Sequence, residues 1–285
     1  MYVDGSGWTA AMVNDIGYIG QMSKEPSEEA MLHNGARFHV ATQVTAAGAL
    51  ANGPESGVIG FSKAPTTFLA ALVADQKISR NAFSLCLAAQ GGTIVLGGSD
   101  QNLHLPSATT AVSPMVPKAN KYALSLVDIR IGPQSISSVW FPTSTVLVDS
   151  GSTLSYLPPG VVVSFVQAFK QATGVDYVDS TLYSRDKVLA WPTITLEFAG
   201  SAPETKVTLE LPPTKYMYET SSGQFIPGLR TRTPTAGVVG ANAMVDIDIL
   251  FDLDRNEIAF TPANCSHTSA TSKTPDQPVD KLKLE

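Results

Sequence analysis

The fold class that the sequence predicts is all-β with a few short helices. Short runs rich in β-branched and aromatic residues recur between Gly, Pro and Asn turns, and only two segments have helical periodicity. The chain has 285 residues, of which 44% are hydrophobic, enough for one large or two medium globular units with real cores. The β-rich runs are 37–44, 83–88, 93–98, 121–132, 145–149, 192–198, 206–212 and 247–260.

The two segments with helical periodicity are predicted to be helices. Residues 66–76 begin with threonine, which favours a helix start, and carry apolar residues at helical spacing. Residues 158–174 place apolar side chains on one face and stop at a glycine, a common helix terminator. The apolar residues are Leu69, Leu72 and Val73 in the first segment, and Val162, Phe165, Val166 and Phe169 in the second.

Charge and hydrophobic patterning exclude two classes of partner. The net charge is -6 and the Lys and Arg residues form no stripe, so we expect no nucleic-acid partner. No window approaches about 18 uninterrupted apolar residues, so no membrane-spanning segment is predicted. Residues 1–17 contain acids and glycines where a signal peptide would need a basic start and an apolar segment.

Cysteine and histidine are sparse. Cys86 and Cys265 are either buried thiols or one long-range bridge, because two cysteines are too few for a zinc cluster and these lie too far apart for a Cys-X-X-Cys motif. The acids of 246–257 alternate with large apolar residues and lack the glycine of a calcium loop, which favours an amphipathic strand pair. The histidines lack ligand spacing, so we predict no metal site and no cofactor; they are His33, His39, His104 and His267.

An internal repeat is the most informative pattern. Residues 56–62 (SGVIGFS) and 236–242 (AGVVGAN) share a Gly-aliphatic-aliphatic-Gly core in β-rich surroundings. Between them, the aliphatic run 145–148 ends in Asp149-Ser150-Gly151. One interpretation is an ordinary turn or helix cap opened by the aspartate. The other is a strand whose purpose is to hold one acid rigidly.

The order of these motifs resembles that of pepsin-family (A1-type) aspartic peptidases, and of their plant, protist and memapsin-like branches. "YVDGSG" (2–7) is similar to the active-site flap, with Tyr2 as the flap tyrosine, and "SGVIGFS" to an N-lobe segment. "FSLCL" and "GGTIVLGGSD" resemble the following family stretch, and "VDSGSTLSYLP" the second catalytic motif. "GVVGANAMVDIDILFDLDRNEIAFTPANC" matches the closing motif, so the resemblance covers about residues 1–265.

The resemblance implies a bilobal pepsin-like fold with an incomplete N-terminal lobe. Residues 1–117 would form the partial N-terminal lobe from the flap onward, and 118–265 the C-terminal lobe with Asp149. The polar segment 266–285 is expected to be a disordered tail. The chain contains one Asp-Ser/Thr-Gly motif where a two-lobe enzyme uses two, so we expect the first catalytic aspartate to lie before Met1.

The resemblance also implies a reaction. Two carboxylates share a proton and activate a water that hydrolyses a peptide bond, which makes the protein an aspartic endopeptidase with a peptide or protein substrate. Gly151 would allow a tight turn in which backbone N–H groups and the Ser152 hydroxyl bond the carboxylate. The implied site residues are catalytic Asp149 and substrate-binding Tyr2, Val3, Asp4, Gly151 and Ser152.

Further implications concern assembly and location. The family branch joins the two places that Cys86 and Cys265 occupy, so the resemblance implies a disulfide between them and a secreted or vacuolar/lysosomal protein, a monomer at full length. Asn264-Cys265-Ser266 is a formal glycosylation sequon, usable if the chain is secreted.

Two other functions stay open. The first is a catalytically inactive homologue that binds a peptide or protein in the same cleft, favoured if the upstream motif carries Asn, Ser or Gly. The second is a single-motif chain that completes its pair of aspartates by dimerising. The repeat argues against dimerisation, because one aliphatic-Gly motif before Asp149 and one after it already account for two lobes.

Overall fold

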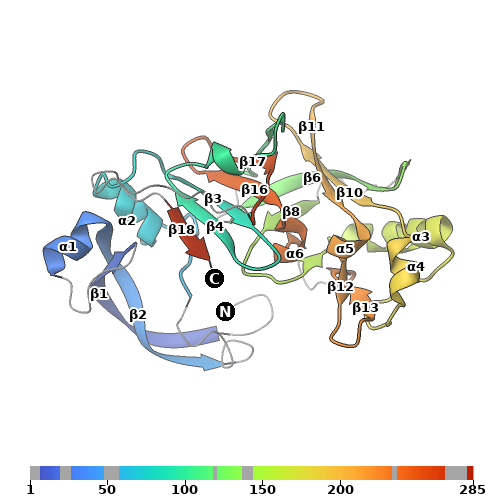
Figure 1. The fold of residues 1–285 in the computed structure, drawn as a ribbon, viewed down its shortest axis with the longest axis horizontal. Helices are drawn as coiled ribbons and strands as arrows, with labels where there is room; N and C mark the ends of the chain where they lie inside the picture. The colour runs from blue at the N-terminus through green and yellow to red at the C-terminus, as the bar shows by residue number, and fades with distance from the viewer. Residues whose placement is uncertain are drawn as a thin grey trace.

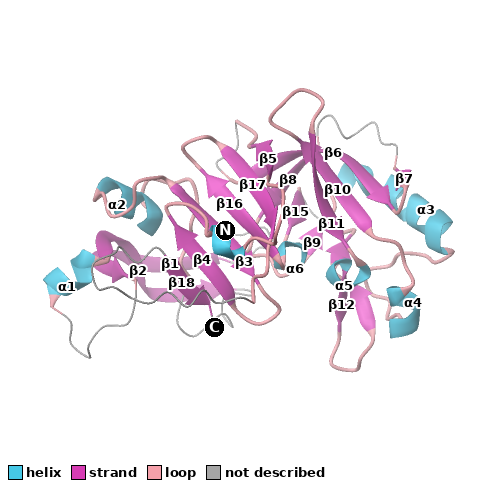
Figure 2. Ribbon diagram, turned by 45° about the horizontal axis from the view of Figure 1, so that its top comes forward, coloured by secondary structure: helices cyan, strands magenta, loops and turns pink. Residues whose placement is uncertain are grey.

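The structure is a computed structural model that describes residues 7–19, 27–47, 58–117, 121–136, 144–232, 236–266 and 281–284. Strands dominate these residues and helices are few and short, which confirms the predicted all-β class (Figure 2). No described helix has the length and apolar character needed to cross a membrane.

A six-stranded sheet joins distant parts of the chain. Its strand order is β18-β4-β3-β16-β17-β5, so two strands from near residue 250 lie between strands that precede residue 115 (Figure 1). The pairing along β3, β16 and β17 is antiparallel throughout. The strands are β3 (Ala82–Leu87), β4 (Gly92–Leu96), β5 (Ala111–Pro114), β16 (Ile247–Asp252), β17 (Glu257–Pro262) and β18 (Lys281–Leu284).

One disulfide fastens this sheet. Cys86 on β3 is bonded to Cys265, just beyond β17, with the two Cα atoms 5.1 Å apart and both residues buried. The bridge confirms the predicted pairing. It closes a loop of 179 residues, and in the chain-entropy model such a loop contributes up to about 5 kcal/mol of stability.

A second, larger sheet contains the strand that ends at Asp149. Its order is β11-β10-β6-β8-β15-β9-β14, with the short β7 paired to β6. Its apolar residues face the core: in β11, Val207, Leu209 and Leu211 are buried and alternate with exposed residues. The strands are β6 (Ala123–Ile131), β7 (Gln134–Ser135), β8 (Thr145–Val148), β9 (Ser155–Tyr156), β10 (Ile194–Ala199), β11 (Lys206–Leu211), β14 (Leu229–Arg230) and β15 (Gly237–Val239).

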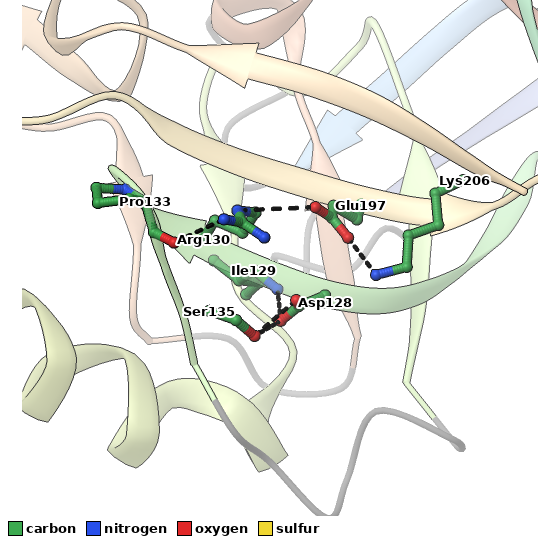
Figure 3. A network of polar contacts seen from close by, with 7 residues as sticks. All are labelled: Asp128, Ile129, Arg130, Pro133, Ser135, Glu197 and Lys206. Atoms are coloured by element: carbon green, nitrogen blue, oxygen red, sulfur yellow. Dashed lines mark hydrogen bonds and ion pairs between the residues drawn. The ribbon is translucent and has the colours of Figure 1, made fainter.

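Charged side chains also connect strands of the larger sheet. Glu197 on β10 is buried and lies between two cations, 2.5 Å from Nζ of Lys206 and 4.0 Å from Nε of Arg130 (Figure 3). Asp128 on β6 accepts hydrogen bonds from the Ser135 hydroxyl and from the Ile129 N–H. The carboxylates of Glu197 and Asp128 are therefore both compensated, as burial of a charged group requires.

Both predicted helices are present. The Thr67 hydroxyl accepts a hydrogen bond from the Ala70 N–H and starts α2 (Phe68–Ala74), and α3 (Val162–Thr173) ends at Gly174, whose φ of 72° suits glycine. Phe165 and Phe169 of α3 are fully buried. The other helices are α1 (Glu28–His33), α4 (Arg185–Leu189), α5 (Pro213–Tyr216) and α6 (Ala241–Met244). Two further antiparallel strand pairs are β1 (Gly7–Tyr18) with β2 (Gly35–Ala47), and β12 (Met217–Glu219) with β13 (Phe225–Pro227).

The structure also describes the acidic segment 246–257 and part of the predicted tail at 266–285. Asp248 and Asp252 lie on β16 and Glu257 begins β17, the strand pair that the alternation predicts, while Asp246 and Asp254 lie in turns beside these strands. In the segment expected to be a disordered tail, residues 281–284 instead form β18, which pairs antiparallel with β4. Lys and Leu alternate in the sequence of this segment, the period of two that is typical of a strand. The division at residue 117 stays a prediction.

Candidate active site

Asp149 follows the last residue of β8, where the strand is fixed from both sides. β8 pairs antiparallel with β6 and parallel with β15. Val146 and Val148 are buried, and the Asp149 N–H donates to the Val239 carbonyl at 3.0 Å. Asp149 itself is exposed. A buried strand thus presents one carboxylate to solvent from a rigid position.

The turn after Asp149 holds its carboxylate. The Gly151 N–H donates to Oδ1 at 3.0 Å, and the Ser152 hydroxyl donates to Oδ2 at 3.3 Å. The Ser152 N–H closes the turn on the Asp149 carbonyl at 3.1 Å. A side chain at position 151 would put its Cβ 3.1 Å from Oδ1, so glycine suits the close approach. The contacts that the family resemblance implies for Gly151 and Ser152 are therefore present.

β15 lies between β8, the strand before the Asp149 turn, and β9, the strand after it. It runs parallel to β8, with Val239 opposite Val148, and its Val238 is bridged antiparallel to Tyr156 of β9. The chain thus leaves β8, turns at Asp149, and returns along the other side of β15.

Gly240, directly after β15, is where this turn closes over the strand. A Cβ at position 240 would lie 2.3 Å from the Leu154 carbonyl oxygen and 2.6 Å from that of Ser152. The next N–H, of Ala241, donates to the Ser152 carbonyl at 2.8 Å. The aliphatic-Gly motif is therefore a strand followed by a backbone contact that only glycine permits.

A polar network that the sequence did not predict links the end of the Asp149 turn to the residues after β15. The Ser155 hydroxyl accepts from the Gly240 N–H at 3.0 Å and donates to Oδ1 of Asn242 at 2.8 Å. The Asn242 amide donates to the Lys215 carbonyl at 2.7 Å. Ser155 is fully buried. The available signal was one serine inside an otherwise apolar strand and an asparagine two residues after Gly240.

The first copy of the repeat has a different environment. Val58 and Ile59 are 71% and 54% exposed and lie in irregular chain, and no described strand pairs with them. A Cβ added at Gly60 would meet nothing within 4 Å. Phe61, the last apolar residue of this copy, does contact the core: its ring lies 5.1 Å from that of Phe83.

The structure brings together three of the expected site residues, Asp149, Gly151 and Ser152. The expected flap residues Tyr2, Val3 and Asp4 lie outside the described residues. Within the described ranges, no group of three or more His, Cys, Asp or Glu side chains is placed to hold a metal ion.

Comparison with known proteins gives consistent matches. A family model described as eukaryotic aspartyl protease matches residues 29–263. Probable aspartic-type endopeptidase OPSB of Arthroderma benhamiae is 27% identical over 94% of this chain and 56% of its own length. Aspartic proteinase 39 of Arabidopsis thaliana is 27% identical over 77% of this chain and 47% of its own. Secreted aspartic protease 3 of Candida albicans is 28% identical over 68% and 47%. The chain thus spans about half the length of the curated relatives it matches.

Proposed function

We propose that this chain, which belongs to the eukaryotic aspartyl protease family, is part of an aspartic endopeptidase. In this proposal Asp149 is one of two catalytic carboxylates. The observation that carries the proposal is the position of Asp149. Its backbone is fixed between strands, its two carboxylate oxygens accept hydrogen bonds from Gly151 and Ser152, and it remains exposed.

The chemistry is general acid–base catalysis. Two carboxylates a few ångströms apart cannot both ionise cheaply, so the pair shares one proton. The ionised member takes a proton from a bound water while the protonated member donates to the carbonyl oxygen of the peptide bond. The water oxygen then attacks the carbonyl carbon, and no covalent enzyme intermediate forms. Gly151 and Ser152 hold one oxygen each of the Asp149 carboxylate, which fixes its direction during these transfers.

Substrate contacts are assigned by the family pattern. We assign Tyr2, Val3 and Asp4 to a flap that covers a peptide or protein substrate and excludes water. Gly151 and Ser152 border the same substrate beside Asp149. The assignment includes a partial N-terminal lobe at 1–117, a C-terminal lobe at 118–265 and a monomeric full-length protein.

The second carboxylate is the main requirement of the proposal. Residues 1–285 contain one Asp-Ser/Thr-Gly motif, so the partner aspartate would come from another segment of the protein. The second candidate function is a catalytically inactive homologue that binds a peptide or protein at the same site, which an Asn, Ser or Gly in place of the partner aspartate would favour. The residue that occupies the aspartate position of the other motif distinguishes the two functions.

The proposed location is the secretory pathway. Disulfides persist in oxidising compartments, and the Cys86–Cys265 bridge is buried in the six-stranded sheet. A relative named as a secreted aspartic protease agrees with this location. Within this pathway we propose that the protein is secreted, with a vacuole or lysosome as the alternative destination.

Hydrolysis of a fluorogenic peptide across a pH series tests the proposal. A protein that combines this chain with a second Asp-Ser/Thr-Gly motif should cleave in acid, lose activity towards neutrality as the shared proton leaves, and be inhibited by a pepstatin-type compound. Residues 1–285 alone should show no cleavage at any pH. Pepstatin-sensitive turnover by monodisperse 1–285 would contradict the two-carboxylate assignment.

A further inference from the structure

The tripeptide Asn264-Cys265-Ser266 follows β17 and takes no part in the proposed reaction. It is the only Asn-X-Ser/Thr sequence in the chain with X other than proline. Exposure alternates along it: Asn264 and Ser266 are exposed, while Cys265 between them is buried in the disulfide. The asparagine and the hydroxyl that a glycosylating enzyme recognises are therefore both exposed to solvent, in a segment that leaves β17 and turns at Cys265 and Ser266.

The Asn264 side chain is available. None of the described residues forms a hydrogen bond with its amide, and its only polar contact is made by the backbone N–H, which donates to the Leu103 carbonyl at 2.8 Å. A glycan on Nδ2 would therefore displace no contact of the folded chain. It would project into solvent beside the six-stranded sheet and well away in sequence from Asp149.

The backbone of the same segment is held on both sides once the protein is folded. Ala263 forms a bridge with His104 and donates its N–H to the Asp246 carbonyl at 3.2 Å. Cys265 is fixed to Cys86, with 5.1 Å between the Cα atoms. An enzyme that must draw an asparagine and the hydroxyl two residues later into its own site needs this backbone free.

We infer that Asn264 is an N-glycosylation site that is modified before the Cys86–Cys265 disulfide closes. The inference rests on the proposed secretory location. The donor is a lipid-diphosphate-linked oligosaccharide: Nδ2 of Asn264 bonds to its anomeric carbon, the bond from that carbon to the diphosphate oxygen breaks, the lipid diphosphate leaves with the electron pair, and the amide gives up one proton. Disulfide formation takes seconds to hours, which leaves time for the transfer after Cys265 has been synthesised.

The first arm of the test asks whether the site is used. The full chain, directed into microsomes by an added leader, is analysed by peptide-N-glycosidase digestion and mass spectrometry. We expect one glycan, lost in Asn264→Gln and in Ser266→Ala and kept in Asn102→Gln, a nearby asparagine outside any sequon. The readout does not need a folded or active product, so its result is independent of peptidase activity.

A positive control for entry into the lumen is available in the chain. Glu219→Asn creates a sequon with Thr220 and Ser221 at an exposed position of β12. If this variant is glycosylated at position 219 while Asn264 stays unmodified, the site assignment is overturned, whereas the proposed peptidase function is untouched.

The second arm tests the order of events. Purified unglycosylated chain with the disulfide closed, and the same chain reduced and unfolded, are each given oligosaccharyltransferase and the lipid-linked oligosaccharide. We expect glycan transfer to the reduced chain and no transfer to the oxidised chain. Equal transfer to both forms would overturn the ordering, and transfer to neither would overturn the site.

Discussion

The two copies of the aliphatic-glycine motif are nearly the same in sequence and opposite in environment. In the second copy, Val239 is fully buried in β15 between β8 and β9, and three backbone atoms lie within 2.6 Å of where a Cβ on Gly240 would be. In the first copy, Val58 and Ile59 are exposed and Gly60 has open space around it.

The aliphatic-glycine motif therefore does not form a strand by itself. A three-residue β15 gains its stability from the two neighbours that cover it and supply its hydrogen bonds, because β-propensity mainly reflects such packing. Asp149 depends on the same neighbours, since Val239 accepts its N–H. Where no described strand flanks the motif, the same residues lie in irregular chain.

Substituting the two glycines should give the largest contrast. Gly240→Ala forces backbone of the Asp149 turn to move, and we expect it to lower the free energy of unfolding by about 3 kcal/mol. Gly60→Ala should change it by less than about 0.5 kcal/mol, because its Cβ meets no atom. Urea unfolding of both variants measures the difference, and equal effects would mean that the two environments are alike.

Truncating one aliphatic residue in each copy should give a smaller contrast of the same sign. Val239→Ala removes buried methyl groups and should cost about 2 kcal/mol. Ile59→Ala removes groups that are mostly in water, so the midpoint of unfolding should barely move. A loss at Ile59 as large as that at Val239 would show that a partner covers the first copy in solution.

A buried carboxylate of the six-stranded sheet, Asp248 on β16, should make stability depend modestly on pH. Burial raises the pKa of Asp248 above its ordinary 3.8, although His104 opposes the shift by bonding its carboxylate at 2.8 Å. The folded state then holds the proton more tightly than the unfolded state. The contribution of protonated Asp248 to the free energy of unfolding is fully present below pH 3.8 and is lost as pH rises through the raised pKa of this residue.

Asp248→Asn should therefore flatten the decline in unfolding free energy that begins as the pH rises above about 4, as measured by urea midpoints. Asp176→Asn serves as the control, because Asp176 is exposed, and should leave the slope unchanged. An unaltered slope in Asp248→Asn would assign the pH dependence to other groups.

Local patterns were sufficient for much of the fold. Periodicity located the helices at 68–74 and 162–173, and alternation identified the strand pair at 247–262. The disulfide came from the family resemblance, since two cysteines 179 residues apart carry no local signal for pairing.

The remaining features depend on which distant segments meet. Nothing in the sequence of β16 states that it lies between β3 and β17, and nothing near Val58 states that it is exposed. At the site, the acid and its turn were predicted, whereas the Ser155–Asn242 contact joins residues 87 apart. Pairing over such separations is set by the packing of the whole chain and not by local propensity.

The most direct test of Asp149 compares acid-pH cleavage rates in a protein that carries both aspartate motifs. Asp149→Asn keeps the shape of the side chain but removes one titrating carboxylate, so the rate should fall by about three orders of magnitude or more, with little change in stability. The exposed Asp186→Asn should cleave at the parent rate. If the Asp149→Asn protein retained a rate close to that of its parent, Asp149 would not be a catalytic carboxylate.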